Sequence, residues 1–253
     1  MPEHVYDEPH EMFRFVSDEH RQFLIAIANE RDELKAVNHI QGLYSAALSH
    51  VRLSDKADLI VYQLLGFTHY HFLFATACQF RCHMAEAFNS LRCAIDGALV
   101  AAWLIKDRAS QEAYYQRKKP FDKLNRHLRN LVREKRTERL PHPHIPILLE
   151  MHELCSRFAS HADVDTFAHR AREFRDESGV EWATHEYFQF SRDVREQRYH
   201  FFSLMHGFLV LLDVFSGFLV GEQKKVPAEW QQELHGVIAS IEKVRAATGP
   251  DDI

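Results

Sequence analysis

Residues 56–106 contain no proline and only two glycines, Gly66 and Gly97. Strands are short and are punctuated by glycine and proline, so a run of this length without them is typical of helix. A single helix this long is unusual in a globular protein, and we expect two helices with a break near QFRCH at 79–83. The whole chain has only 9 Gly and 8 Pro. The sequence therefore predicts an all-α fold, a multi-helix bundle of long antiparallel helices.

Apolar residues at helical spacing predict further helices on both sides of this run. The expected helical segments are 18–49, 111–136, 146–160, 192–221 and 228–246, after an irregular N-terminal arm at 1–16. The three prolines of LPHPHIP at 140–146 exclude a regular helix interior there. Residues 164–190 place DESG between β-tolerant flanks, so a small β-hairpin and an irregular insertion both remain open. With no linker or repeat, we expect a single helical domain over 1–253.

The two most apolar segments are CAIDGALVAAWLI and HGFLVLLDVFSGFLVG, each interrupted by an aspartate, Asp96 or Asp213. We expect both to be buried helices and no contact with a membrane. The N-terminus, MPEHVYDEPHEMFRF, lacks the basic region followed by an apolar region that a signal peptide requires. The four cysteines lack the spacing of a disulfide framework, which is typical of free thiols in a reducing compartment. The sequence therefore predicts a cytoplasmic protein.

Metal-binding patterns are weak despite the 18 histidines. A carboxylate-bridged di-metal bundle needs Glu-x-x-His on each of two helices, and no expected helix contains it. Cys78, Cys82 and His83 fall short of the four closely spaced ligands of a structural zinc site, and such cysteines are more often small core residues. We expect no metal and no cofactor.

A charged pair, Arg92 and Asp96, lies one turn apart within the apolar run NSLRCAIDGALVAAWLIKD at 89–107. On a helix, this pair shares a side with Phe88, Leu99 and Trp103, so we expect it to face inward. Burial of charge is costly, and a guanidinium has five donors, more than one carboxylate can satisfy. A third group must therefore contact Arg92.

The segment SRFASHAD at 156–163 supplies the best candidates for that group: Ser156, Ser160 and His161. His206, within FFSLMHGFLVLLDVF, is another polar side chain expected to face inward. Two interpretations follow. These polar side chains form either a buried network that fixes helix register or the lining of a pocket for a small polar ligand. The cluster comprises Arg92, Asp96, Ser156, Ser160, His161 and His206.

The run AEAFNSLRCAIDGA, together with SRFASH, resembles an uncharacterised family of bacterial all-helical proteins. In that family an R-x-x-x-E element is followed, after an intervening helix, by an S-x-x-x-H element. Here Arg92 and Asp96 match the first element, with Asp in place of Glu, and the second lies at 156–161. The family is grouped loosely with HEPN-like proteins, some of which are ribonuclease toxins or antiphage factors. The resemblance implies a helical fold over about 60–220.

HEPN ribonucleases resemble one another in an R-x4–6-H motif, in which Arg holds phosphate and His acts on the 2′-hydroxyl. Arg195 and His200 fit this motif on an expected helix. They are five residues apart, about 140° around the helix, so their side chains must converge to act together. This match implies a metal-independent ribonuclease or an antiphage toxin-like protein as the alternative function.

The basic segment 108–139 has eleven Lys or Arg residues against four acids, in a chain whose net charge is −5. A solvated helix face explains this pattern, and an RNA- or phosphate-binding surface is the functional interpretation. We expect a structural or ligand-binding helical module rather than an enzyme, and a homo-oligomer, most simply a homodimer, formed through long apolar helices.

Overall fold

Two antiparallel helices, α3 (Lys56–Phe80) and α4 (Met84–Lys106), form the centre of the protein. The computed structural model describes residues 11–49, 53, 55–159, 171–175, 179–185, 194–221 and 224–249. Asp55 caps α3 by accepting a hydrogen bond from the Asp58 backbone N–H at 2.9 Å. The chain reverses at Cys82, whose φ of 62° lies in the left-handed region. The predicted break near 79–83 is confirmed.

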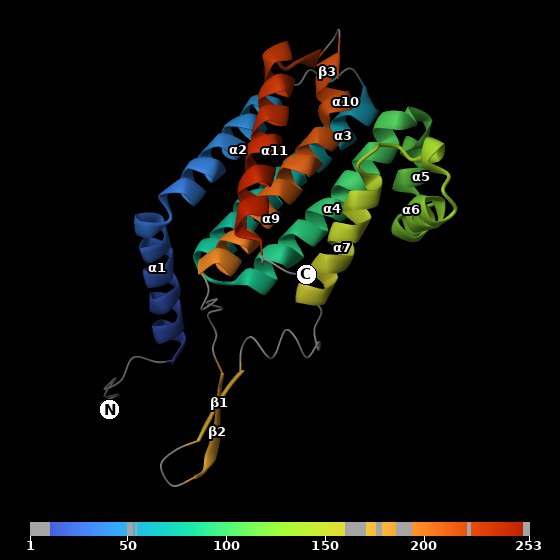
Figure 1. Cartoon of the computed structure of the whole chain (residues 1–253). Helices are drawn as coiled ribbons and strands as arrows, with labels where there is room; N and C mark the ends of the chain where they lie inside the picture. Colours follow the sequence, from blue (N-terminus) through green and yellow to red (C-terminus); the bar gives the residue numbers. More distant parts are fainter. Residues whose placement is uncertain are drawn as a thin grey trace, which may run out of the picture.

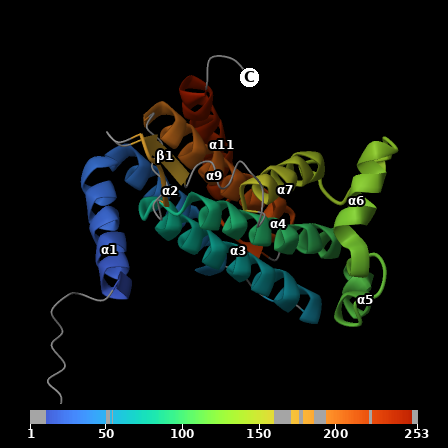
Figure 2. The same ribbon diagram turned by 90° about the horizontal axis from the view of Figure 1, so that it is seen from below.

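Three more long helices surround this pair (Figures 1 and 2). The helix α9 (Val194–Val214) packs against α3 and α4, α11 (Ala228–Thr248) covers α9, and α7 (Ile145–Ala159) packs against α4. In Figure 2, α3 and α7 lie on opposite sides of α4. A contiguous core of Leu, Phe, Ile and Ala side chains joins these helices, and the predicted all-α bundle is confirmed.

The N-terminal part differs from the prediction in two places. Residues 11–16, expected to be irregular, begin α1 (Glu11–Asn29), whereas 1–10 lie outside the described residues. The single helix expected over 18–49 is two, because α1 ends at Asn29 and α2 (Arg31–Ser49) follows it. No glycine or proline marks this junction at Glu30, so the local sequence carries no stop signal.

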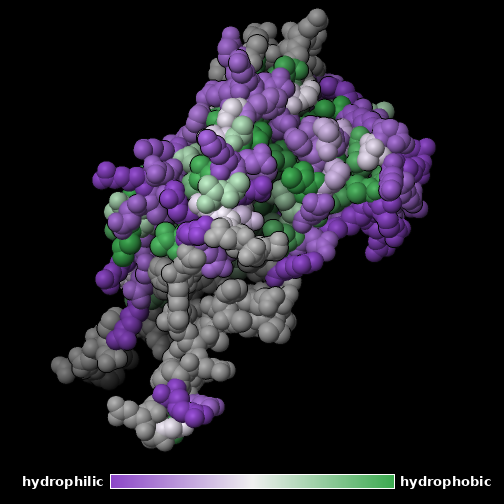
Figure 3. Space-filling view, in the orientation of Figure 1, coloured by the Kyte–Doolittle hydropathy of each residue, from purple (hydrophilic) through white to green (hydrophobic). Residues whose placement is uncertain are grey.

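A lobe of short helices follows α4 and is called here the α5–α6 lobe. It comprises η1 (Arg108–Ser110), α5 (Gln111–Tyr115), η2 (Phe121–Lys123), α6 (Leu124–Arg133) and η3 (Thr137–Arg139). The lobe is attached through Leu124, Leu128 and Leu131, the buried stripe of α6. Its outer rim is mostly hydrophilic on the face seen in Figure 3.

Strands are few in the described residues. β1 (Ala171–Arg175) and β2 (Glu181–His185) form an antiparallel hairpin in which Phe174 pairs with Trp182, so the hairpin alternative for 164–190 is the one observed. The helix α9 is followed by α10 (Ser216–Leu219), β3 (Val220–Gly221) and β4 (Lys224–Lys225).

Two helical segments, Met84–Lys106 and Val194–Leu219, are long and apolar enough by composition to cross a membrane. In the most apolar 18-residue stretch of each segment, 61% and 89%, respectively, is buried inside the bundle. Core helices of globular proteins share this property, so length and composition alone are weak evidence for a membrane span.

Candidate functional site

The charged pair of α4 does not face the core as predicted. The side chain of Asp96 is 56% exposed, and its Oδ1 lies 3.3 Å from Nε2 of His152 on α7. Arg92 is half-buried on the same helix. The inward face of α4 instead consists of apolar residues, including Leu91, Ile95 and Leu99. Asp96 lies at the border of this face, where water solvates its charge and burial would be costly.

The other predicted members of the cluster are Ser156 on α7, His206 on α9, and Ser160 and His161. The Ser156 hydroxyl donates to the carbonyl of His152 at 2.7 Å, within α7. Ser160 and His161 lie outside the described residues. His206 on α9 is 4% exposed, and its charged neighbours are Arg245, Glu242 and His144 rather than Arg92. The prediction is therefore wrong in expecting Asp96 to be buried and His206 to neighbour Arg92, whereas its other members stay a prediction.

The candidate nuclease residues lie in the first two turns of α9. The side chain of His200 is only 14% exposed; its ring packs edge-on against Phe88, with centroids 6.0 Å apart, and its Nε2 lies 3.7 Å from Oε1 of Glu196. Arg195 is exposed. A catalytic histidine must reach its substrate, and this one is largely covered by the bundle.

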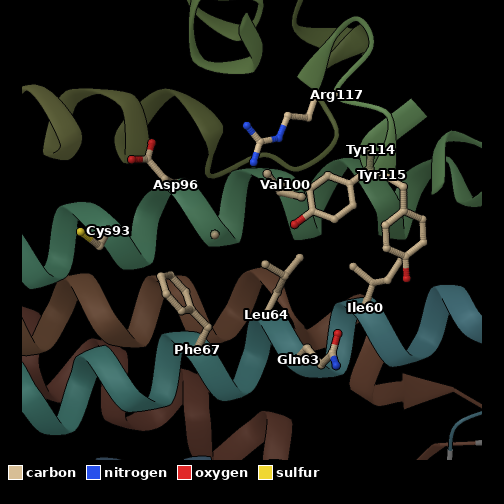
Figure 4. Close-up of a pocket in the computed structure, with 11 residues that line it drawn as sticks. Ile60, Gln63, Leu64, Phe67, Cys93, Asp96, Val100, Tyr114, Tyr115 and Arg117 are labelled. Carbon is tan, nitrogen blue, oxygen red and sulfur yellow. The ribbon is translucent and has the colours of Figure 1, made fainter. Parts of the chain in front are cut away.

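A hollow lies beside Asp96, and we call it the α4 groove (Figure 4). Its volume is about 750 Å³, which is in the range of small-molecule sites. Its lining is contributed by α3, α4 and the α5–α6 lobe: Ile60, Gln63, Leu64, Phe67, Cys93, Asp96, Gly97, Val100, Tyr114, Tyr115 and Arg117. A Cβ at Gly97 would lie 3.0 Å from Phe67, so glycine permits the close approach of α3 and α4 at the floor.

The polar groups of the α4 groove lie at its rim. Figure 4 shows Arg117 and Tyr114 extending from the α5–α6 lobe toward α4, on the side of α4 that carries Asp96. The rest of the lining is mostly apolar, with Gln63, Cys93 and Tyr115 among isoleucine, leucine, phenylalanine and valine side chains. An apolar floor with a few convergent polar groups is the usual composition of a ligand site.

The backbone at Arg117 is in the left-handed region, with φ of 48°. The Lys118 N–H donates to the carbonyl of Ala113 at 2.8 Å, and the Arg117 N–H to that of Tyr114 at 3.0 Å. These two bonds form a Schellman motif, in which glycine is the usual residue at the left-handed position because a Cβ is strained there. Arginine at this position keeps a cation at the groove despite that strain.

Two smaller hollows continue from the α4 groove along the α5–α6 lobe. One, of about 350 Å³, shares Asp96 and Val100 with the α4 groove. The other, of about 460 Å³, is lined by Trp103 and by the basic residues Lys119, Lys123 and Arg126. Lys123 and Arg126 line both of these hollows. Asp122 also lines both hollows, so the wall from the α4 groove to Trp103 carries more cations than acids without being uniformly basic.

The basic segment 108–139 is partly neutralised by its own surroundings. Within the described chain, four of its arginines have carboxylate partners: Arg108 with Asp55 and Asp58, Arg129 with Glu153, Arg136 with Glu134 and Arg139 with Glu138. The cations that line the hollows are a different set. This division favours a local anion site at the hollows over a uniformly basic surface.

A second polar cluster, missed by the sequence analysis, joins the proline-rich loop to the bundle. Nε2 of His144 lies 2.9 Å from Oδ2 of Asp213 on α9, and Nε2 of His235 on α11 lies 3.2 Å from Oδ1. Burial alone would raise the pKa of Asp213, but the hydrogen bonds and charges of both imidazoles outweigh it and lower that pKa. Because the three residues lie far apart in sequence, no local spacing pattern could reveal the cluster.

Among the residues that the structure describes, no group of three or more His, Cys, Asp or Glu side chains is arranged to hold a metal ion. No family model matches the chain, and no curated protein or solved structure is detectably similar to it.

Proposed function

We propose that the chain is a binding module whose α4 groove holds a small molecule with an apolar body and an anionic group, a carboxylate or a phosphate. The observation that carries the proposal is the left-handed Arg117 at the rim of a groove with an apolar floor. The left-handed turn at Arg117 ends α5 and sets the direction in which this side chain extends toward the groove.

The chemistry of the walls supports this ligand class. Arg117 provides a planar guanidinium that pairs with carboxylate or phosphate, and Lys123 and Arg126 extend the positive wall. Leu64, Phe67 and Val100 offer apolar contact to the rest of the molecule. Asp96, on the same side of α4, can accept a hydrogen bond and repels a second anionic group placed next to it.

The test uses 1-anilinonaphthalene-8-sulfonate, an aromatic anion whose sulfonate stands in for the carboxylate or phosphate and whose fluorescence rises on transfer to an apolar site. We expect saturable binding to the folded wild type and binding at least tenfold weaker in Arg117→Gln, because a charge-assisted hydrogen bond contributes about 1.5–3 kcal/mol. Lys135→Gln is the matched control, since Lys135 occupies the same left-handed position after α6, away from the groove.

Equal binding to all three proteins contradicts the proposal. Native mass spectrometry of the purified wild type complements the titration, since a retained small anion that is absent from Arg117→Gln would identify the ligand class directly.

The ribonuclease alternative makes a separate prediction. It requires RNA cleavage that persists in EDTA and disappears in His200→Ala, with the fold intact. The limited exposure of His200 favours binding over this alternative, and RNA cleavage by the wild type with that mutational pattern would replace the binding proposal.

A further inference from the structure

The outward face of α3 is apolar and uncovered in the part of the chain that the structure describes. No Lys, Arg, Asp or Glu occurs between Asp58 and Arg81, so α3 has none of these residues beyond its first turn, a composition typical of buried helices. Yet one side is exposed: Leu59, Phe67, Tyr70, Leu73 and Phe74 each retain 41–60% of their accessible surface. Figure 2 shows α4, α7 and α9 together on one side of α3. We call these five residues the α3 face.

The α3 face is large and ordered. At roughly 200 Å² for each large side chain, its members expose about 450 Å² of mostly apolar surface, within the range of the largest patch on a typical monomer, which is often functional. The rings of Tyr70 and Phe74 stack with centroids 6.2 Å apart and planes 10° from parallel. Ordered aromatic rings lose little conformational entropy on association.

We propose that the α3 face binds a second copy of this chain, with the two α3 helices antiparallel about a two-fold axis near the Gly66–Phe67 peptide bond. Leu59 and Phe74 lie at equal distances along the sequence on the two sides of this bond. Gln63 and Tyr70 do the same. A two-fold axis therefore brings Leu59 level with Phe74 of the second copy, and Gln63 level with the second copy's Tyr70, where an amide and a hydroxyl can hydrogen-bond.

Three features favour a second copy over another partner. The α3 face has no charge, so it can meet itself without repulsion in a chain of net charge −5. A Cβ built at Gly66 meets nothing within 4 Å, so the outward side of the helix is open there and two helices can approach closely at the axis. The exposed area also suits the apolar core of a standard interface, which buries about 800 Å² per partner, with the remainder supplied by flanking residues.

The pairing has a consequence for the α4 groove, which rests on the proposed function. Gln63 and Phe67 belong both to the outer side of α3 and to the groove lining. A two-fold axis perpendicular to the helices keeps equivalent residues on the same side of the pair, so the two grooves open side by side and meet near Phe67 of each copy. Phe74 of the second copy then closes the end of the groove at Ile60.

The test is the mass of the full chain by light scattering at about 10 µM, where a submicromolar dimer is fully formed. We expect about 59 kDa, twice the 29.7 kDa of one chain. Leu59→Lys and Phe74→Glu should each give monomers, with Kd rising roughly 10³-fold, or about 4 kcal/mol at 1.4 kcal/mol per tenfold. Leu154→Lys, at an equally exposed leucine on α7, is the matched control and should remain a dimer.

The antiparallel register has its own test. An equimolar mixture of the Leu59→Lys and Phe74→Glu proteins should form a heterodimer, because the introduced ammonium group of one chain meets the introduced carboxylate of the other. A monomeric wild type, or a dimer that survives both single changes, overturns the proposal, as does a mixture that stays monomeric. Groove binding of 1-anilinonaphthalene-8-sulfonate, measured on the Leu59→Lys monomer, keeps failure of the dimer separate from failure of the proposed function.

Discussion

Replacing Arg117 by glycine should make the protein more stable and its α4 groove less able to bind an anion. A non-glycine residue in the left-handed region costs about 1–2 kcal/mol, and glycine removes that cost. Glycine also adds backbone freedom to the unfolded chain, which offsets about 0.5–1 kcal/mol. The net gain expected for Arg117→Gly is therefore about 0.5–1 kcal/mol, or roughly 1–3 °C in Tm for a chain of this size.

Lys135→Gly separates the backbone effect from the side-chain effect. Lys135 has φ of 56°, and its motif has the same two closing bonds, from Lys135 N–H to Val132 and from Arg136 N–H to Leu131. Both glycine variants should therefore gain similar Tm by circular dichroism, whereas only Arg117→Gly should lose roughly 10- to 100-fold in affinity for 1-anilinonaphthalene-8-sulfonate. Equal losses of affinity in the two variants, or a lower Tm in both, would refute the reasoning.

Three further predictions concern the core and its ionisable groups. Gly207→Ala should destabilise the protein by about 1–2 kcal/mol, because the new Cβ would lie 2.5 Å from Met151 Cε and 2.9 Å from Leu91 Cδ2. Gly236→Ala has nothing within 4 Å of its new Cβ and should instead stabilise the protein by about 0.5–1 kcal/mol. Urea titrations measure both changes. Burial, together with the charge of Arg245, lowers the pKa of His206. The unfolded chain therefore takes up a proton near pH 6.5 that the folded chain does not. The free energy of unfolding should fall as pH drops from 7.5 to 5.5, and less steeply in His206→Leu. Burial and the charge of Glu33 raise the pKa of Glu30 to about 7. The contribution of protonated Glu30 to the free energy of unfolding is therefore present below pH 4.5 and lost as pH rises through 7. Glu30→Gln should stabilise the protein by about 1 kcal/mol at pH 8, after allowance for partial exposure, and hardly at pH 5.

Local signals in the sequence were sufficient where they act over a few residues. The proline-free run and the residues around Cys82 predicted α3, α4 and the break between them, because the end of a helix depends on nearby backbone chemistry. The junction at Glu30 has no such signal, so one helix was predicted where there are two. Here the contacts of α1 with α3 and of α2 with α9 decide the direction of the chain.

The candidate site was predicted only in part, for a physical reason. Helical periodicity places Asp96 beside the apolar face of α4 but cannot say whether a neighbouring helix covers that border, and the structure leaves it open to water. The strained position of Arg117 depends on how the chain turns after α5, and the sequence there has neither the glycine nor the asparagine that normally marks such a turn.

The proposed dimer connects these observations. A helix with so few charged residues is normally buried, and the bundle covers much of α3 but leaves the α3 face exposed. The α4 groove begins where that face ends, since Gln63 and Phe67 border both. A second copy on the α3 face would exclude water from the end of the groove at Ile60, which strengthens the attraction between Arg117 and an anion. If both proposals hold, monomeric Leu59→Lys should therefore bind the sulfonate probe more weakly than the wild-type dimer, though still more tightly than Arg117→Gln.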